Sequence, residues 1–172
     1  MNSTNKSVDF SDSFVISCGT VTVDLVASKV LLIRTRKTNE CYLPKGRKDI
    51  DESLHAAAIR ETYEETGVLA RTLPVKIVTR ATTAAGRAIH AGAQNVTEPF
   101  AVSQRITNGV RKIIFWFVAV ADSTVVPNEG TQQADEDFLS VWVAFEAVGS
   151  TLDFEDDIRV AEAGIVAAVA TV

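Results

Sequence analysis

The sequence predicts one sandwich domain of the α+β or α/β class, and three observations support this prediction. Strand-like runs rich in Val, Ile and Thr lie on both sides of one long helical segment. A second amphipathic helical pattern ends the chain. The 172 residues are 47% hydrophobic, enough for one globular core, and contain no repeat or linker. We therefore expect a single domain over residues 14–172, preceded by a flexible polar terminus at residues 1–13.

The first part of the chain is predicted to form strands. Residues 14–25 and 29–36 are rich in Val, Ile and Thr and are separated by a short polar link, which indicates two strands. Residues 41–46 continue as a short extended piece. Pro44 and Gly46 should break that piece into a loop.

The clearest helix follows this loop, with its body at residues 52–66. Asp49 and Glu52 are spaced as a capping box, in which two side chains satisfy free backbone N–H groups at the start of a helix. Gly67 suits the position just after the helix, where a left-handed residue closes the last turn.

The second half combines strand patterns with a long irregular stretch. Residues 74–80, 111–122 and 138–145 are predicted strands, and the second of these is apolar on both faces. Residues 81–108 lack periodicity and are predicted to form one or two long loops, which in compact domains are often functional. Apolar residues at spacings of four, three and four then predict a terminal helix. They are Phe154, Ile158, Ala161 and Ile165.

The N-terminus is polar and has no apolar segment of the kind that a secretory signal needs. No run of about 18 apolar residues is present that would span a membrane. Cys18 and Cys41 have no metal-ligand spacing, and we expect reduced, partly buried thiols rather than a disulfide. These features predict a cytoplasmic protein without membrane contact. The alternative is a secreted protein whose signal peptide has been removed.

The net charge of −5 hides a separation of charge along the chain. Two stretches, 34–48 and 76–112, each carry six Lys or Arg against one acid, whereas 113–157 has ten acids and no base. Such a pattern concentrates a polyanionic ligand on one region of an acidic protein. The alternative is that these charged loops simply solvate the surface. The basic residues are Arg34, Arg36, Lys37, Lys45, Arg47 and Lys48, then Lys76, Arg80, Arg87, Arg105, Arg111 and Lys112.

Three glutamates, Glu61, Glu64 and Glu65, lie in the last turns of the predicted helix, just before Gly67. Carboxylates there face the negative end of the helix dipole, and like charges at this spacing repel each other. On a helical wheel they continue the stripe that should pack on the sheet. The earlier residues of that stripe are Leu54, Ala57 and Ala58.

Carboxylates that converge near a core must be compensated, because burying an unpaired charge is costly. They can take up protons, pair with arginines, or bind a hard divalent cation such as Mg²⁺ or Mn²⁺, which prefers oxygen ligands. The alternative is an acidic helix end that faces solvent.

This segment resembles the signature of the Nudix hydrolases over its full length, from Gly46 to Val68. Gly46 is followed after five residues by Glu52, and after seven more by the run RETYEETGV at residues 60–68. Thr62 is the one departure, because the family has an aliphatic residue there, and we expect it to loosen helix packing slightly. The resemblance covers residues 14–170 and implies an α/β/α sandwich with a mixed central sheet.

The resemblance also implies hydrolysis of a diphosphate linkage, with Mg²⁺ or Mn²⁺ as cofactor. Glu61 and Glu64 would be catalytic, Glu61 as a further metal ligand or as the base that orients the attacking water. Arg60 would pair with a carboxylate and hold the helix geometry, and Glu52 would complete the acidic cluster. The implied metal ligands are Gly46 (through its carbonyl), Glu61, Glu64 and Glu65.

The substrate is indicated by basic residues around the signature. Residues 43–47, LPKGR, resemble the branch that acts on dinucleoside polyphosphates and diphosphoinositol polyphosphates. With only two Trp and two Tyr to stack on a base, an inositol pyrophosphate is the favoured substrate, followed by a dinucleoside polyphosphate. Charge-assisted hydrogen bonds would hold its phosphates. The predicted phosphate-binding residues are Arg34, Arg36, Lys45, Arg47, Lys48, Arg80, Arg111 and Lys112.

Two other functions stay open. An RNA-decapping enzyme would combine the same signature with a basic RNA track and with stacking aromatics such as Tyr42, Tyr63 or Phe100. A protein of the same fold could instead only bind a phosphorylated ligand, although every glutamate of the signature is present. His90, in the long loop, could touch phosphate or act in acid–base chemistry, but an incidental loop histidine is the simpler interpretation.

Overall fold

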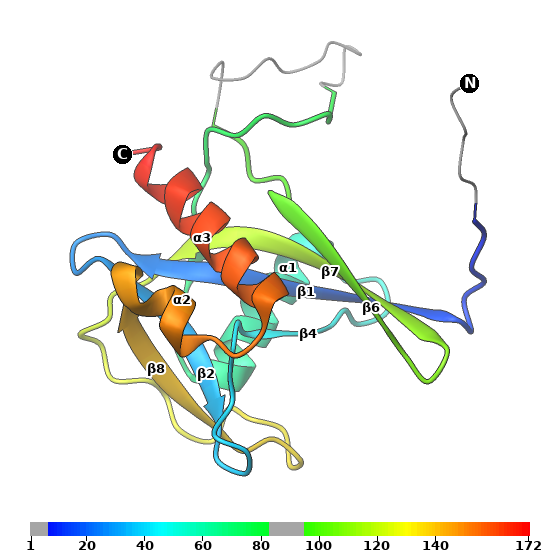
Figure 1. The fold of residues 1–172 in the computed structure, drawn as a ribbon, viewed down its shortest axis with the longest axis horizontal. Coiled ribbons are helices and arrows are strands. Elements are labelled where there is room, and N and C mark those ends of the chain that lie inside the picture. The colour runs from blue at the N-terminus through cyan, green and yellow to red at the C-terminus, as the bar shows by residue number, and fades with distance from the viewer. Residues whose placement is uncertain (1–6, 83–94) are drawn as a thin grey trace.

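The computed structural model describes residues 7–82 and 95–172 (Figure 1). The protein is built on an eight-stranded mixed sheet with a long helix on each face, which confirms the predicted sandwich. The strands are β1 (Phe14–Asp24), β2 (Lys29–Thr35), β3 (Cys41–Tyr42), β4 (Lys45–Arg47), β5 (Arg71–Thr72), β6 (Ala101–Thr107), β7 (Val110–Val120) and β8 (Phe138–Ala144). The helices are α1 (Leu54–Thr66), α2 (Val148–Thr151), α3 (Glu155–Val169) and the 3-10 turn η1 (Phe145–Ala147).

β1 and β7 run parallel through the middle of the sheet, in register from Phe14 opposite Arg111 to Val23 opposite Val120. A parallel pair between two helix layers needs apolar residues on both faces, and both strands have them. β2 and β4 pair antiparallel with β1, at different places along it, while β5 and β6 pair antiparallel with β7. β3 and β8 extend the sheet from β2.

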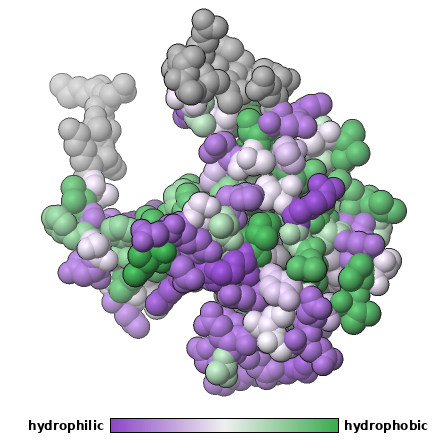
Figure 2. Space-filling model, turned by 180° about the vertical axis from the view of Figure 1, so that it is seen from behind, coloured by the Kyte–Doolittle hydropathy of each residue, from purple (hydrophilic) through white to green (hydrophobic). Residues whose placement is uncertain are grey.

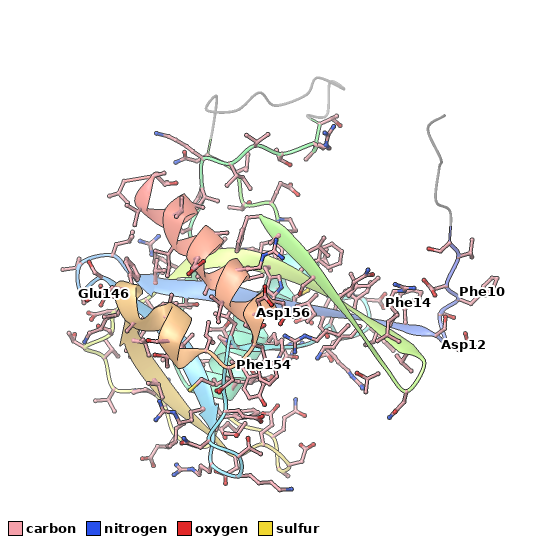
Figure 3. The ribbon with its side chains drawn as sticks, in the orientation of Figure 1. Phe10, Asp12, Phe14, Glu146, Phe154 and Asp156 are labelled. Carbon is pink, nitrogen blue, oxygen red and sulfur yellow. The ribbon has the colours of Figure 1, made fainter. Side chains whose placement is uncertain are left out.

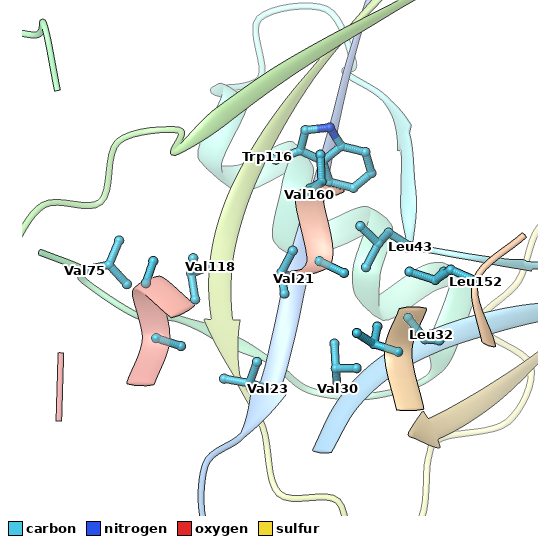
Figure 4. Packing of buried hydrophobic residues seen from close by; sticks show 14 of the residues in the cluster. Val21, Val23, Val30, Leu32, Leu43, Val75, Trp116, Val118, Leu152 and Val160 are labelled. Carbon is cyan, nitrogen blue, oxygen red and sulfur yellow. The ribbon is translucent and has the colours of Figure 1, made fainter. Parts of the chain in front are cut away.

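α3 covers one face of the sheet. Val21 and Trp116 on the central strands belong to the same buried cluster as Val160 of the helix (Figure 4). Gly164 lets helix and strand meet closely, because a Cβ there would come within 2.7 Å of the Cβ of Val21. The ring of Trp116 is fully buried, and its Nε1 donates a hydrogen bond to Ser103 Oγ at 2.9 Å.

α1 covers the other face, where Ala57 and Ala58 pack against Cys18 and Phe117. Both cysteines of the chain are free and buried. The small alanines let the helix axis approach the sheet, so the acidic residues in the last turns of α1 are carried close to the strands. No helix among the described residues combines the length and hydrophobicity needed to cross a bilayer.

Thr62, the departure from the family pattern, has a polar partner in the sheet. Thr20 Oγ1 lies 2.7 Å from the hydroxyl oxygens of both Thr62 and Thr22. The Thr62 hydroxyl also donates to the carbonyl of Ala58 at 2.8 Å. The threonines on these facing elements thus satisfy each other, and their buried hydroxyl groups hold α1 to β1.

Several predicted elements are confirmed and others are wrong. The strand predicted at 74–80 is absent, and Val75 makes only an isolated bridge to Val96. The extended piece at 41–46 is not broken at Gly46, which is the middle residue of β4. Strands are confirmed within four predicted ranges: 14–25, 29–36, 111–122 and 138–145.

The predicted loop at 81–108 contains β6, so that prediction is wrong for residues 101–107, and residues 83–94 lie outside the described part of the chain. The terminal helix is confirmed, but its buried face is centred on Ala161, Gly164 and Ala168 rather than on the larger predicted side chains. Small residues occupy the contact because helix and sheet approach closely there.

Part of the described sheet projects from the body. β6 and the first halves of β1 and β7 extend from the body as an arm (Figure 1). Viewed from behind, the surface at the base of this arm is strongly hydrophilic (Figure 2). The carboxylates of α1 and the basic residues of β4 belong to this part of the fold.

Candidate functional site

The start of α1 differs from the prediction. Ser53 is the N-cap, and its Oγ accepts a hydrogen bond from the N–H of Ala56 at 3.1 Å, so the predicted capping box is wrong. Asp49 and Glu52 instead close a turn ahead of the helix. The Asp49 N–H donates to Glu52 Oε2 at 3.0 Å, and the Glu52 N–H donates to the Asp49 carbonyl at 3.3 Å. This turn fixes the Glu52 carboxylate in front of α1.

α1 ends at Gly67 as predicted, with a left-handed φ of 70°. Side chains from the loop before β8 reach the last carbonyls of the helix. Thr131 Oγ1 donates to the carbonyl of Glu64 at 2.8 Å, and Gln132 Nε2 donates to that of Glu65 at 3.2 Å. Because these donors occupy free carbonyls of the last turn, they weaken the negative end of the helix dipole beside the glutamates.

The carboxylate of Glu61 is buried against β4, and the residue is 4% exposed. It occupies the space that a side chain at position 46 would need, since a Cβ on Gly46 would meet Glu61 Oε2 at 1.8 Å. Only glycine leaves room for the carboxylate here. Burial raises the pKa of Glu61, and the hydrogen bond from Arg60 opposes that rise.

Arg60 gathers the acidic groups of α1. Its Nη1 donates to Glu61 Oε1 at 2.8 Å and to Glu64 Oε2 at 2.9 Å. Its Nε and Nη2 hold the two oxygens of Glu52 at 2.8 and 2.9 Å, and Nη2 also donates to the carbonyl of Arg47 at 2.9 Å. The bidentate contact with Glu52 raises the pKa of Arg60 and lowers the pKa of Glu52. One guanidinium therefore fixes three glutamates relative to β4.

Glu65 is the second buried carboxyl group of α1, at 5% exposure. Its Oε2 accepts a hydrogen bond from the backbone N–H of Lys45 at 2.7 Å. Burial raises the pKa of Glu65 to about 8, although the charge of Lys45 opposes this. A nearby cation would stabilise the ionised form of this carboxyl group, because it replaces the hydration that burial removes.

The donor set suits a hard divalent cation. One oxygen each of Glu61, Glu64 and Glu65 is hydrogen-bonded, and the second oxygen of each has no hydrogen bond to a described residue. Among the residues that the structure describes, no three acidic, histidine or cysteine side chains converge tightly enough to hold an ion as they stand. Glu64, whose side chain is 28% exposed, has room to turn toward the buried pair. Oxygen-only ligands of this kind fit Mg²⁺ or Mn²⁺.

Half of the predicted phosphate-binding residues lie near these carboxylates. Lys45 and Arg47 flank Gly46 on β4, and Lys48 follows with its Nζ donating to the carbonyl of Asp49 at 2.7 Å. Lys112 is on β7, separated from β4 only by β1. Burial first, and then the charge of Lys45, lower the pKa of Lys112.

Of the other half, three contact other groups and one is exposed. They are Arg34, Arg36, Arg80 and Arg111. Arg36 pairs with Asp137 at 2.8 Å, and Arg111 pairs with Asp9 at 2.9 Å. Arg34 donates to a cysteine sulfur at 3.2 Å, and Arg80 is exposed in the segment after β5. Two further residues considered for phosphate contact, Arg87 and His90, lie outside the described residues.

Glu136, in the loop before β8, was not predicted from the sequence. Its charge contributes to the raised pKa values of both Glu61 and Glu65, so it lies near them. The Glu136 carboxylate accepts a hydrogen bond from the Gln133 N–H at 3.0 Å. No motif marks this residue, because it comes from a loop more than sixty positions from the helix; only the concentration of acids after position 113 hinted at it.

An aromatic pair was also missed. The rings of Tyr42 and Phe154 stack with centroids 5.0 Å apart and planes 16° from parallel. Phe154 stands at the start of α3, next to Asp156 (Figure 3). Lys45 Nζ lies 5.5 Å from the Tyr42 ring centre, and the Arg105 guanidinium lies 5.8 Å from that of Phe154. Two cations are therefore positioned by one stacked pair.

Comparison with known proteins agrees with this geometry. A family model described as NUDIX domain matches residues 18–163 of the chain. No curated protein matches the sequence closely enough to count as a relative.

Solved structures with the same fold include three hydrolases. A NUDIX family hydrolase from Clostridium perfringens has a TM-score of 0.59 and 20% identity, covering 91% of this chain and 98% of its own. An Ap4A hydrolase from C. elegans has a TM-score of 0.60 and 16% identity, covering 87% and 93%. A NUDIX hydrolase from Nitrosomonas europaea has a TM-score of 0.58 and 15% identity, covering 90% of each chain.

Proposed function

This chain belongs to the NUDIX family, and on that premise we propose that it is a metal-dependent hydrolase that cleaves a diphosphate linkage in a polyphosphorylated small molecule. Nudix hydrolases act on pyrophosphate bonds and generally use divalent metal ions such as Mg²⁺.

The observation that carries the proposal is the burial of Glu61 against Gly46, with the buried Glu65 beside Lys45. Two carboxyl groups with raised pKa values, kept close to a strand by one arginine and one backbone N–H, destabilise the protein unless a cation joins them. A metal site accounts for this unfavourable arrangement, whereas a helix end with a purely structural role does not need it.

The assignment of roles follows from these contacts. Glu61, Glu64, Glu65 and the carbonyl of Gly46 would hold Mg²⁺ or Mn²⁺. A bound ion would offset the charge that builds on phosphoryl oxygens and make the attacking water more acidic. Arg60 keeps Glu61 and Glu64 oriented, and Glu61 either binds the ion or orients the water.

The substrate remains a polyphosphate held by the cations next to the carboxylates. We propose Lys45, Arg47, Lys48 and Lys112 for this role, because they are the predicted residues nearest to Glu65 and Gly46. A diphosphoinositol polyphosphate is the first candidate, because most of the basic side chains near the carboxylates form no ion pair with a described residue and are available to phosphates. The stacked pair of Tyr42 and Phe154 favours a dinucleoside polyphosphate as the second candidate, because aromatic faces bind bases.

The test is a product assay with purified protein and Mg²⁺. A diphosphoinositol polyphosphate, a diadenosine polyphosphate and a capped RNA are offered at equal concentration. We expect cleavage of the first, which Glu64→Gln abolishes while its melting temperature stays close to that of wild type. The matched control is Glu146→Gln, at an exposed glutamate in η1 (Figure 3).

The outcomes separate the alternatives. Preferential cleavage of the dinucleotide or of capped RNA keeps the hydrolase proposal and replaces its substrate. Binding of a polyphosphate without metal-dependent turnover of any of the three contradicts the hydrolase proposal and favours a binding protein.

A further inference from the structure

β6 is an edge strand of the projecting arm (Figure 1). It pairs with β7 on one side, and no other strand within the described part of the chain pairs with it. Natural proteins protect such an edge with a proline, a charge or a covering segment, because its free backbone groups pair readily with another strand. β6 contains no proline, and its only charged side chain, Arg105, is engaged by Asp156 and Asp157 of α3. The edge of β6 is therefore open to another strand.

The hairpin that joins β6 to β7 determines which backbone groups of β6 point outward. Asn108 and Gly109 form its two-residue turn with φ values of 52° and 79°, as a type I′ turn requires. Thr107 and Val110 flank this turn, so they exchange the two hydrogen bonds of a closing pair, and such pairs alternate with non-bonded pairs along the ladder. In the non-bonded pairs the N–H and C=O groups of β6 point away from β7. These residues are Val102, Gln104 and Ile106.

A second copy of β6 matches these outward groups. When two copies pair antiparallel about a two-fold axis at Gln104, Val102 of one copy lies opposite Ile106 of the other. Every outward N–H and C=O group of the three residues then meets an outward group of the partner. Apolar side chains meet on both sides of the axis, and no like charges lie opposite each other. The edge is therefore complementary to itself, which a two-fold interface requires.

The arm also exposes apolar side chains around this edge. Five of them, on β6, at the start of β7 and in the segment before β1, are each at least 40% exposed. That segment is tied to the centre of the edge, because Arg111 donates to Asp9 and to Gln104, each at 2.9 Å. Seen from behind, hydrophobic residues of the arm lie between hydrophilic ones (Figure 2). The five residues are Val8, Phe10, Val102, Ile106 and Val110.

The size of this apolar surface is sufficient for a small interface. At their exposed fractions the five side chains present about 500 Å² per copy, so two copies present about 1,000 Å², the size that a specific interface needs. A monomer rarely leaves a larger contiguous apolar patch in water. The expected dissociation constant of such an interface lies in the micromolar range.

We propose that the chain forms a homodimer in which the β6 strands of two copies pair antiparallel about a two-fold axis at Gln104, so that the two sheets become one. The inference goes beyond the proposed function and does not depend on it. The partner is a second copy rather than an unrelated peptide, because both the outward backbone groups and the apolar side chains of β6 match their own symmetry mates.

The dimer is tested by sedimentation velocity of the full chain at concentrations up to about 500 μM. We expect wild type to shift reversibly from monomer to dimer as the concentration rises. Gln104→Pro removes the outward N–H on the axis and no bond to β7, so it should weaken self-association by about tenfold or more. Gln104→Ala is the matched control, because it keeps the N–H group and loses only the side chain, and it should associate like wild type.

A pair of introduced charges tests the register. Ile106→Lys and Val102→Glu should each weaken the dimer by about tenfold, because each places a charge opposite an apolar side chain. The double variant should restore it, since the introduced carboxylate of one copy then lies opposite the introduced ammonium of the other. Within one copy the two positions are about 13 Å apart along the strand and cannot pair. Val126→Lys is the control, at an 84% exposed valine in the loop between β7 and β8, and it should leave association unchanged.

Wild type that sediments as a monomer at every concentration would overturn the proposal. A dimer that survives Gln104→Pro, or that Val126→Lys weakens as much as Ile106→Lys does, would also overturn it. If the melting temperature shows that Gln104→Pro does not fold, the charge pair decides alone. Restored association in the double variant then supports the pairing of Val102 with Ile106, and its absence contradicts that pairing.

Discussion

Replacing Gly46 with alanine perturbs the carboxylate site at its most crowded point. The new Cβ would lie 1.8 Å from Glu61 Oε2 and 2.1 Å from its Cδ. Ordinary contacts begin at 3.4 Å, so the oxygen would have to retreat by about 1.6 Å. Glu61 is 4% exposed and is held by Arg60, so its carboxylate cannot retreat without losing its buried position or its hydrogen bond.

We expect Gly46→Ala to lower kcat by about 10²-fold or more, because a misplacement of about 1 Å at an active site costs that much. The fold should survive with a loss of about 1–3 kcal/mol, the usual cost of overpacking. The assays are Mg²⁺-dependent phosphate release and urea unfolding. Gly149→Ala in α2 is the control: its Cβ would meet the nearest atom, Glu162 Oε1 of α3, at an ordinary 3.5 Å, so neither property should fall.

Wild-type turnover in Gly46→Ala would refute the reasoning, because it would mean that the position of Glu61 does not matter. The source of the strain is checked by a double-mutant cycle. In a Glu61→Ala background the clash partner is gone, so Gly46→Ala should cost no further stability. A loss that persists there would locate the strain in the backbone of β4.

Three further substitutions probe the contacts around the site. Arg60→Met leaves several carboxylates without their shared partner and should lower the free energy of unfolding by about 3 kcal/mol in urea titration; a loss below about 1 kcal/mol would show that solvent compensates them. Burial raises the pKa of Asp24, but hydrogen bonds from backbone N–H groups outweigh it and lower the pKa from 3.8 to about 2. The stability that ionised Asp24 contributes is therefore complete above its pKa in the unfolded state, and it is lost as the pH falls through its pKa in the folded state. Asp24→Asn should therefore cost about 2 kcal/mol at pH 7 and progressively less below pH 4, and a cost that does not change with pH would contradict this. Thr62→Val should lower the free energy of unfolding by about 1 kcal/mol in calorimetry, and adding Thr20→Val and Thr22→Val should recover that loss, because no hydroxyl is then left unpaired. If stability is not recovered, hydroxyl pairing is excluded as the cause.

The sequence was sufficient for the features that local spacing determines. The helix α1, its end at Gly67 and the long apolar strands follow from periodicity and from the chemistry of single residues. β6 was missed because only one of its faces is partly covered: Val102 and Ile106 are exposed, and polar residues lie between them. An edge strand of this composition is indistinguishable from a loop by sequence alone.

The candidate site shows the same limit. Neighbours in sequence such as Arg111 and Lys112 face opposite sides of β7, so the count of basic residues in a stretch overstates how many meet in space. Glu136 matches no motif, because it comes from a loop far along the chain from the helix whose carboxylates it approaches. Thr62 was judged alone, and its buried partner Thr20 became visible only in the fold.

β4 has three residues, and its pairing with β1 decides which of them faces Glu61. A shift of one residue in that pairing would turn Lys45 or Arg47 toward Glu61 and would move Gly46 to the other face. Lys45 or Arg47 would then form an ion pair with Glu61 and neutralise its charge. The shifted, inactive register is therefore favoured electrostatically over the observed one. Deletions or insertions of one residue between β2 and α1 are therefore expected to give folded, inactive protein. The hydrogen bond from the Lys45 N–H to Glu65 holds β4 in the observed register.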